Sequence, residues 1–324
     1  MIYQNTISPK KVNTSFAKDI AKGLASNPKR LSSKYFYDAK GDVLFQRIME
    51  MPEYYLTNCE FEIFETHKEA LRLAFGSRAF DLIELGAGDG TKTKILLEHF
   101  LAKNTDFDYV PIDISANVLN HLEADLARRW PDLGVKKMAG EYFQGLQQLA
   151  GNHRRKVVLF LGGNIGNMSP IEAENFLSKI ANYLSSGDLL LIGFDLKKNP
   201  QTILDAYNDP KGITSNFNLN ILERINRELG ANFQLHQFKH WETYNPLSGA
   251  TESFLVSTAA QEVYIAALDQ SFSFKQWEAI HTELSQKYSM EEIQFLAKKS
   301  GFFSVAEFFD ENQYFVDVLW EVRD

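Results

Sequence analysis

Short apolar runs constrain the fold of this chain more than any other feature of its sequence. Four of them are found, at residues 80–85, 109–112, 157–161 and 189–194. None shows regular alternation, and runs of this length are typical of strands that are buried on both faces of a parallel sheet. The segments between them have the apolar spacing of amphipathic helices, as from the potential cap Ser115 to Leu126. Repeated strand–helix–strand order predicts a doubly wound, Rossmann-like α/β sheet.

Helix-end signals support this interpretation. Ser169, Pro170 and Glu172 match a capping box with proline at the first helical position, and Gly187 is expected to close that helix. A further, weaker strand is predicted at residues 135–138.

The strand–helix rhythm stops after Asp195. Residues 197–286 combine one predicted helix, at 218–229, with stretches that alternate apolar and polar residues. This pattern predicts a small α+β insertion that contacts the substrate.

The chain then returns to the first pattern, with a helix at 291–299 that Gly301 closes. Two strands follow, at 302–309 and 314–322, joined by a tight turn, and the last strand is expected to be antiparallel. We therefore predict two domains. A discontinuous doubly wound domain comprises residues 1–196 and 287–324, and a substrate-binding α+β insertion comprises residues 197–286.

Composition excludes several classes of function. The 324 residues carry 34 Lys+Arg and 42 Asp+Glu, a net charge of −8, which argues against binding a nucleic-acid backbone. The single cysteine, Cys59, permits no internal disulfide and fits a reducing compartment. The apolar runs are too short to span a membrane, and no signal peptide is evident. We expect a monomeric cytoplasmic protein without nucleic-acid or membrane partners.

The sharpest motif is a glycine-rich loop at residues 84–90, between the first predicted strand and a helix. Glycines at 86, 88 and 90 allow a tight turn and close approach of a ligand to the backbone. Their spacing differs from the dinucleotide fingerprint. Glu84 and Asp89 add negative charge, which disfavours phosphate and favours a cationic ligand such as S-adenosylmethionine, with its sulfonium and ammonium groups. The alternative is an ordinary strand–helix turn.

Two later positions continue this predicted cofactor site. Asp113 ends the next strand, 23 residues after Gly90, close to the interval of about 20 residues at which an acid binds ribose hydroxyls in related folds. The alternative is a helix cap beside Ser115. Glu141 and Tyr142 follow the weak strand, where an adenine-binding loop is expected, although Glu141 is equally compatible with an ordinary surface acid.

A second glycine-rich loop, residues 161–167, follows the strand at 157–161. Its side chains Asn164 and Asn167 offer neutral acceptors at the edge of the sheet where open α/β folds bind ligands. A neutral acceptor can hold an amine without favouring its protonated form. The alternative is that both asparagines serve only the turn.

No metal site is expected, because the seven histidines are scattered and no metal-binding motif occurs. Cys59 lacks the surroundings of a catalytic nucleophile.

Several blocks beyond the glycine loop resemble the histidine-specific Nα-methyltransferases, which form hercynine in ergothioneine biosynthesis. The resemblance covers residues 31–322. Its blocks are 35–38 with Gly41 and residues 44–45, 51–55, 86–93, 165–168, 206–209, 217–220, 226–230 and 282–288. It implies a class I methyltransferase fold with a small substrate domain, S-adenosylmethionine as cofactor and an amino acid as substrate.

The resemblance also implies roles for individual residues. Those predicted to bind the cofactor are Tyr54, Glu84, Gly86, Gly88, Lys92, Asp113, Glu141 and Tyr142. The substrate α-amine would be positioned by Asn167 and Tyr37, which are the predicted catalytic residues, and the α-carboxylate would be bound by Tyr207. Tyr54 is also predicted to face the substrate. Glu283 and Ser285 would hydrogen-bond the substrate imidazole, with Ser253 near the ring.

Three positions depart from the family pattern. Ser253 replaces a methionine, Trp277 stands where the family often has glycine, and Glu141 replaces an aspartate. The first two leave alternatives open for the acceptor: tryptophan or another aromatic amino acid, or a sulfur-modified histidine of the ovothiol type. A non-catalytic cofactor-binding scaffold is a third alternative.

Overall fold

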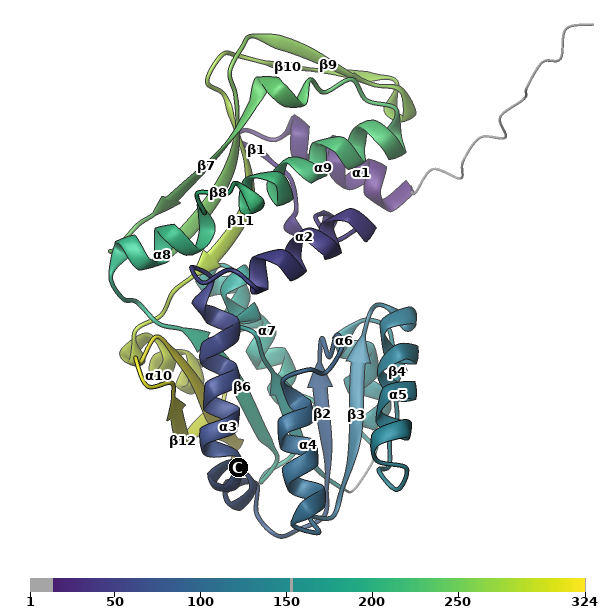
Figure 1. The fold of residues 1–324 in the computed structure, drawn as a ribbon, viewed down its shortest axis with the longest axis vertical. Helices are drawn as coiled ribbons and strands as arrows, with labels where there is room; N and C mark the ends of the chain where they lie inside the picture. The colour runs from purple at the N-terminus through teal and green to yellow at the C-terminus, as the bar shows by residue number, and fades with distance from the viewer. Residues whose placement is uncertain (1–13, 152–153, 324) are drawn as a thin grey trace, which may run out of the picture. The chain divides into compact units, whose positions relative to one another are not determined.

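The computed structural model describes residues 14–151 and 154–323. The chain divides into two compact units, each of which is discontinuous in sequence (Figure 1). The sheet unit comprises residues 55–198 and 285–324, and the cap unit comprises residues 1–54 and 199–284.

A seven-stranded mixed sheet forms the centre of the sheet unit. Its strands, in spatial order, are β12 (Phe302–Phe309), β13 (Phe315–Val322), β6 (Leu189–Asp195), β5 (Arg155–Phe160), β2 (Phe80–Leu85), β3 (Phe107–Asp113) and β4 (Met138–Ala139). All pairs from β6 to β4 are parallel, whereas β13 is antiparallel to both β6 and β12. The order of the strands reverses between β5 and β2. The carboxyl ends of these two strands therefore mark the switch point at which open α/β sheets bind ligands.

Apolar strands explain why this sheet lies inside. Every residue of β2 and of β6 is buried, as the continuous apolar runs predict. The predictions of the doubly wound fold and of an antiparallel last strand are therefore confirmed. The predicted strand at 135–138 is largely wrong, because β4 contains only Met138 and Ala139, and Val135 makes an isolated bridge to Tyr109.

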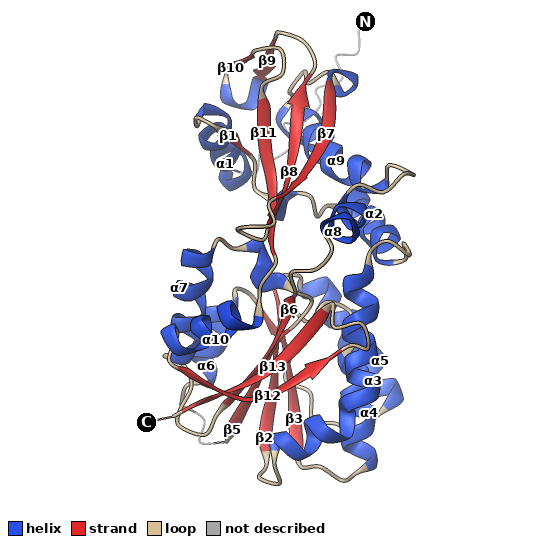
Figure 2. Ribbon diagram, turned by 90° about the vertical axis from the view of Figure 1, so that its left-hand side faces the viewer, coloured by secondary structure: helices blue, strands red, loops and turns tan. Residues whose placement is uncertain are grey.

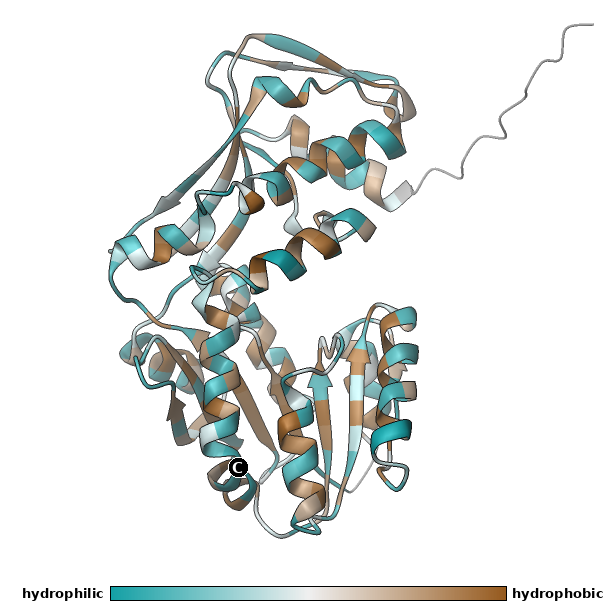
Figure 3. Cartoon of the chain, viewed as in Figure 1, coloured by the Kyte–Doolittle hydropathy of each residue, from teal (hydrophilic) through white to brown (hydrophobic). Residues whose placement is uncertain are grey.

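Helices cover both faces of this sheet (Figure 2). In Figure 2, α3, α4 and α5 lie on one side of the strands and α6, α7 and α10 on the other. The bounds are α3 (Tyr55–Phe75), α4 (Thr93–Ala102), α5 (Ala116–Arg129), α6 (Tyr142–Leu149), α7 (Pro170–Ala181) and α10 (Met290–Lys299), with a 3-10 helix at Asn164–Asn167. Each helix carries apolar and polar residues side by side, so an apolar stripe can pack on the strands (Figure 3).

Local signals set most of the helix ends. Ser115 caps α5, and Ser169 with Glu172 forms the predicted capping box of α7. The prediction that Gly187 closes α7 is wrong: that helix ends at Ala181, and Gly187, with a φ of +85°, lies in the turn before β6. Gly301 follows the end of α10 with a φ of +86°, a conformation that glycine adopts without strain.

A four-stranded sheet and a two-stranded hairpin organise the cap unit, with the four-stranded sheet in the order β1-β11-β8-β7. The strands are β1 (Lys29–Arg30), β7 (Phe238–Tyr244), β8 (Ala250–Ser257), β9 (Gln261–Ile265), β10 (Gln270–Phe274) and β11 (Ala279–Gln286). The α-helices are α1 (Thr14–Ala25), α2 (Ala39–Met49), α8 (Pro200–Tyr207) and α9 (Ile213–Leu229). Three 3-10 helices lie at Ser33–Tyr35, Leu235–Gln237 and Ala266–Leu268.

The cap unit differs from the predicted insertion because residues 14–54 belong to it. The predicted division assigned them to the doubly wound domain. The physical reason is a shared core, in which Phe16, Phe36 and Leu44 pack in one buried cluster with Phe217 and Ile221 of α9. Helix α9 also begins at Ile213, five residues earlier than predicted, because Asp209 accepts hydrogen bonds from the Ile213 and Thr214 amides.

Trp277, one of the departures from the family pattern, has a φ of +67° between β10 and β11. A glycine adopts this conformation at no steric cost, which gives a physical reason for the glycine that the family often has there. The Trp277 side chain is exposed, and its amide donates to the Ser257 carbonyl at 2.7 Å.

Candidate active site

The glycine loop lies where β2 ends and before α4 begins. Gly86, Gly88 and Gly90 have φ values of +79°, +54° and +64°, which side chains rarely allow. A Cβ on Gly86 would lie 2.9 Å from the Tyr142 hydroxyl, and one on Gly88 would meet nothing within 4 Å. The loop therefore offers bare backbone beside open space and a tyrosine, an arrangement that fits a nucleoside-bearing cofactor.

Asp113 ties the end of β3 to this loop. Its Oδ2 accepts a hydrogen bond from the Gly88 amide at 3.0 Å, and its Oδ1 accepts one from the Ser115 amide at 2.8 Å. Ser115, not Asp113, caps α5. Each carboxylate oxygen has a second lone pair, so Asp113 retains capacity to accept from ribose hydroxyls.

Glu141 and Tyr142 begin α6. Tyr142 points its hydroxyl towards Gly86, whereas Glu141 is exposed and makes no side-chain cap of the helix. The structure thus brings Gly86, Gly88, Asp113 and Tyr142 together at the carboxyl edge of the sheet. Their roles in binding the cofactor stay predictions.

Glu84 lies beneath the loop instead of facing solvent. Its side chain is buried and accepts hydrogen bonds from Thr93 Oγ1 at 2.7 Å and from the Tyr109 hydroxyl. Burial raises the pKa of Glu84 to about 7, against the opposing effect of these two donors. The predicted negative charge at this position is therefore partial at neutral pH, and the geometry supports a role for Glu84 in holding the loop.

This raised pKa predicts a pH-dependent stability effect for Glu84→Gln. The folded state keeps the Glu84 proton up to about pH 7, whereas the unfolded chain loses it near 4.5, so wild-type stability falls as pH rises between these values. We expect Glu84→Gln to gain about 2–3 kcal/mol relative to wild type at pH 8 and little at pH 5. Urea unfolding at both pH values measures this, with exposed Glu98→Gln as the control. An equal difference at both pH values would contradict the prediction.

Lys92 precedes α4 at the same edge. Its ammonium pairs with the buried carboxylate of Glu60 on α3 and lies 3.6 Å from the position of a Cβ on Gly162. Burial alone would lower the pKa of Lys92, but the Glu60 carboxylate raises it overall. Lys92 is thus a cation held between the glycine loop and the loop after β5.

Asn167 lies in that second loop. Gly162 and Gly163 have positive φ values and lead into the 3-10 helix that ends at Asn167. Asn164 donates to the Leu161 carbonyl at 2.8 Å, and Asn167 Nδ2 donates to Asn164 Oδ1 at 3.5 Å. Both asparagines therefore take part in the turn, while Asn167 remains exposed, so its amide oxygen can accept from a ligand.

Ser285 is also part of the sheet unit. Its Oγ accepts a hydrogen bond from Lys287 Nζ at 2.8 Å, and the same ammonium pairs with Asp195 Oδ2 at 2.7 Å. All three side chains are buried. Ser285 is therefore held by an internal ion pair.

Three predicted tyrosines of the cap unit are joined through aromatic contacts. Tyr37 contacts Phe45 at a centroid distance of 5.5 Å, Phe45 contacts Tyr54 at 6.4 Å, and Tyr54 contacts Tyr207 at 6.2 Å. Tyr37 also contacts Phe217 of α9. The cap unit thus gathers the three tyrosines from segments that are far apart in the sequence.

Ser253 links two acidic side chains in the cap-unit sheet. Its hydroxyl lies 2.6 Å from Glu242 Oε2 and 3.3 Å from Glu283 Oε2. Glu242 is the register partner of Ser253 on β7, and His240 lies 3.5 Å from its Oε2. Where the family has an apolar methionine, this chain therefore has a polar group between two glutamates.

Sequence reasoning missed Glu242 and Glu60. The alternation of β7 buries Phe238, His240 and Glu242, and a glutamate at a core-facing position of an alternating strand was a readable signal. No comparable signal marks Glu60. It lies in a predicted helix beside apolar positions, and the helical pattern does not indicate which residues it contacts.

The predicted substrate residues are divided between the units. Asn167 and Ser285 belong to the sheet unit, whereas the other five, Tyr37, Tyr54, Tyr207, Ser253 and Glu283, belong to the cap unit. That they line one cavity stays a prediction.

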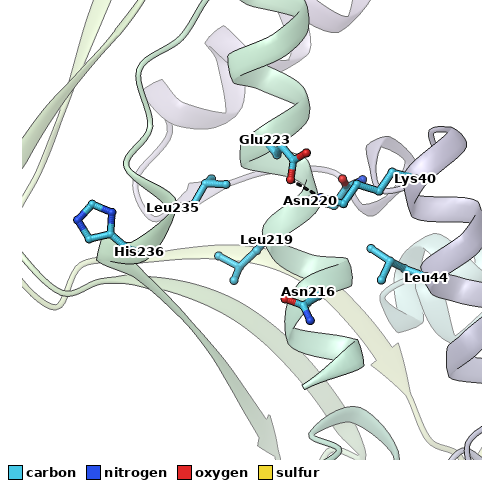
Figure 4. Close-up of a pocket in the computed structure, with 8 residues that line it drawn as sticks. All are labelled: Lys40, Leu44, Asn216, Leu219, Asn220, Glu223, Leu235 and His236. Carbon is cyan, nitrogen blue, oxygen red and sulfur yellow. Dashed lines mark hydrogen bonds and ion pairs between the residues drawn. The ribbon is translucent and has the colours of Figure 1, made fainter. Parts of the chain in front are cut away.

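A separate pocket of about 410 Å³ lies within the cap unit (Figure 4). Leu44 and Lys40 of α2, Leu219 and Glu223 of α9, and His236 contribute to its lining. It includes none of the predicted site residues, so we do not assign it to the reaction.

Two other classes of site find no support in residues 14–151 and 154–323. No group of three or more His, Cys, Asp or Glu side chains that could hold a metal ion occurs there. Within the same residues, no helix combines the length and apolarity needed to cross a bilayer. Cys59 is buried, and burial raises the pKa of its thiol far above the usual value, which keeps it protonated.

Comparison with known proteins gives a consistent result over both units. The model of a family described as histidine-specific methyltransferase, SAM-dependent, matches residues 16–322. Histidine N-alpha-methyltransferase from Mycolicibacterium smegmatis is 37% identical over 85% of each chain, and that from Mycobacterium tuberculosis is 36% identical over 84% of each chain. Ergothioneine biosynthesis protein 1 from Neurospora crassa is 30% identical over 91% of this chain and 34% of its own length.

Proposed function

Because this chain belongs to the family of histidine-specific, S-adenosylmethionine-dependent methyltransferases, we propose that it methylates the α-amine of L-histidine, giving Nα-methylated products up to hercynine. The observation that carries this proposal is that the family match extends through both units, including the cap unit that holds Tyr207 and Glu283. A match to the sheet unit alone would support only the cofactor.

The sheet unit would hold the cofactor. Gly86 and Gly88 leave room for it, Asp113 would accept from ribose hydroxyls, and Tyr142 would border the adenine. Lys92 offers a cation for a carboxylate. S-adenosylmethionine supplies an electrophilic methyl group on a sulfonium.

The chain's own task is to present a neutral amine. The α-amine must lose a proton before it can act as a nucleophile, and a carboxylate beside it would favour the protonated form. Asn167 and Tyr37 are neutral acceptors and donors, and they would hold the amine in line at about 3–3.5 Å from the reacting carbon. A hold through one amide and one phenol also lets the amine reorient between successive methylations.

The cap unit would recognise the rest of the substrate. Tyr207 would donate to the α-carboxylate, and Glu283 would accept from an imidazole N–H. A substrate without that N–H would cover the half-buried Glu283 carboxylate without donating to it, which is a physical basis for discrimination.

The Ser253 contacts favour one alternative acceptor over the others. A wall made of Ser253 hydrogen-bonded to Glu242 and Glu283 is more polar than one made by methionine. Such a wall disfavours an indole ring and favours an imidazole with a further polar substituent. A sulfur-modified histidine is therefore the second candidate acceptor.

Mass spectrometry tests the proposal directly. The purified chain is incubated with S-adenosylmethionine and, in separate reactions, with histidine, tryptophan, a thiol-substituted histidine or no acceptor. We expect mono-, di- and trimethylated histidine, with little product from tryptophan. Faster methylation of the thiol-substituted histidine would select the second candidate, and no methylated amino acid despite cofactor binding would leave the scaffold alternative.

A further inference from the structure

Glu60 joins the two loops of the predicted reaction site. It lies on α3, with no exposed surface. Its Oε2 pairs with the Lys92 ammonium, and its Oε1 accepts a hydrogen bond from the Gly162 amide at 2.7 Å. One carboxylate therefore holds both the cation beside the glycine loop and the first glycine of the turn that leads to Asn167.

The sheet provides a dedicated space for this carboxylate. A Cβ on Gly193 of β6 would lie 2.6 Å from Glu60 Oε1 and 2.8 Å from the Phe315 ring. Any other residue at position 193 would therefore displace Glu60 or Phe315. The Glu60 side chain packs against β6 at Gly193, which explains why this position of the buried strand has no side chain.

Asp317 lies next to Glu60 in the same layer. It is the register partner of Gly193 on the neighbouring strand β13 and has no exposed surface. No residue that the structure describes donates a hydrogen bond to either of its carboxylate oxygens. Burial, together with the nearby Glu60 carboxylate, raises the pKa of Asp317 well above its usual value. The raised pKa favours the protonated form of Asp317, whose proton can be donated to Glu60.

We propose that Glu60, backed by Asp317, is a positioning residue that holds Lys92 and the Gly162 turn at a set separation for methyl transfer. Only the kinetic part of this inference rests on the proposed function. The Glu60 carboxylate neutralises the charge of the Lys92 ammonium. A protonated Asp317 adds a hydrogen-bond donor and no further charge to this buried group. Lys92 follows the glycine loop that would bind the cofactor, and Gly162 begins the loop that would hold the substrate amine. A substitution of Glu60 is therefore expected to affect both loops.

Amide hydrogen exchange, S-adenosylhomocysteine affinity and turnover test this in the full chain. In Glu60→Ala we expect exchange in residues 161–167 of the ligand-free protein to be about 10-fold faster, because the Gly162 amide loses its acceptor. We expect S-adenosylhomocysteine to bind about 10-fold more weakly by calorimetry, because the ion pair that holds Lys92 is lost. With histidine, kcat should fall about 100-fold, as a displacement of about 1 Å can do.

Conservative variants separate the two arms. Glu60→Gln keeps an oxygen for the Gly162 amide but loses the charge that pairs with Lys92, so exchange should stay near wild type while affinity falls. Asp317→Ala removes the donor to Glu60, so we expect faster exchange in residues 161–167 and weaker S-adenosylhomocysteine binding than in wild type. Asp317→Asn, whose amide N–H replaces the acid proton as a donor, should stay closer to wild type in both measurements. Should Glu60→Ala fail to fold, Glu60→Gln still decides the matter, because unchanged S-adenosylhomocysteine affinity in that variant would overturn the proposal.

Asp188 offers a matched control at the opposite ends of the strands. It is also buried, accepts from the Lys156 amide at 2.8 Å and pairs with the Lys156 ammonium at 3.5 Å. Asp188→Ala should lower the melting temperature without changing exchange at 161–167 or ligand affinity. The proposal is overturned if Glu60→Ala retains wild-type exchange and affinity, or if Asp188→Ala changes both equally. A wild type that does not methylate histidine would refute the proposed function instead, while exchange and affinity would still test Glu60.

Discussion

Asn167→Ala should reduce methyl transfer to histidine by about 100- to 1,000-fold while S-adenosylhomocysteine binds with nearly unchanged affinity. The expected loss is large because the amide oxygen would hold the amine in line with the methyl group, and misalignment of reacting groups costs orders of magnitude in rate. Affinity should be retained because Gly86, Asp113 and Tyr142, which would hold the cofactor, do not depend on this side chain. Single-turnover kinetics and calorimetry measure the two quantities.

Asn182→Ala is the matched control for this prediction. Asn182 is an exposed asparagine that follows α7 in the same unit, and its removal should leave turnover unchanged. Hydrogen exchange in the Asn167 variant checks that the 3-10 helix Asn164–Asn167 persists. Retained turnover in Asn167→Ala would remove this residue from the catalytic site.

Glu283→Ala should lower kcat/KM for histidine by about 100-fold or more, again with little change in cofactor affinity. A carboxylate that accepts from an imidazole N–H contributes a charge-assisted hydrogen bond, and such bonds are the main source of discrimination between ring systems. We also expect the preference for histidine over tryptophan to decrease, since the half-buried carboxylate that penalises an apolar ring is removed. Competition between the two acceptors, followed by mass spectrometry, measures this preference directly.

Glu252→Ala controls for the loss of an acid from the same sheet. Glu252 neighbours Ser253 on β8 but pairs with His281 at 3.2 Å, so its removal should not alter the preference. A parallel loss of cofactor affinity and histidine turnover in Glu283→Ala would contradict the assigned role. Unchanged kinetics would move recognition of the imidazole to other residues.

The sheet was predictable because burial on both faces leaves a strong local signal. The run at 80–85, in which every residue is buried, predicts β2 with its observed ends, Phe80 and Leu85. The length of β4 was predicted too great. How much of residues 135–139 pairs with β3 depends on the packing around this segment and not on its own residues. The end of α7 was missed because a glycine with positive φ can also serve a turn beyond the helix, as Gly187 does six residues after Ala181.

Candidate site residues were predictable where a loop carries its own signature. The glycines at 86 and 88 and the acid at 113 are such cases, and the structure places them in contact through the Gly88–Asp113 hydrogen bond. The sequence suggested that Glu84 contributes charge, but burial beneath the loop raises its pKa and changes that role. Whether Asn167 and Glu283 act on one substrate stays a prediction.

The sequence by itself determined which apolar runs form the central strands, where the glycine loops lie and to which family the chain belongs, because each of these depends on residues close together along the chain. Only the tertiary structure decided that residues 14–54 pack with 199–284, that Ser253 bridges Glu242 and Glu283, and that Glu60 meets Lys92, Gly162 and Gly193. These contacts join positions separated by tens to hundreds of residues. These contacts are stabilised by burial and by hydrogen bonds. Both depend on how the chain packs, so they produce no periodic pattern in the sequence.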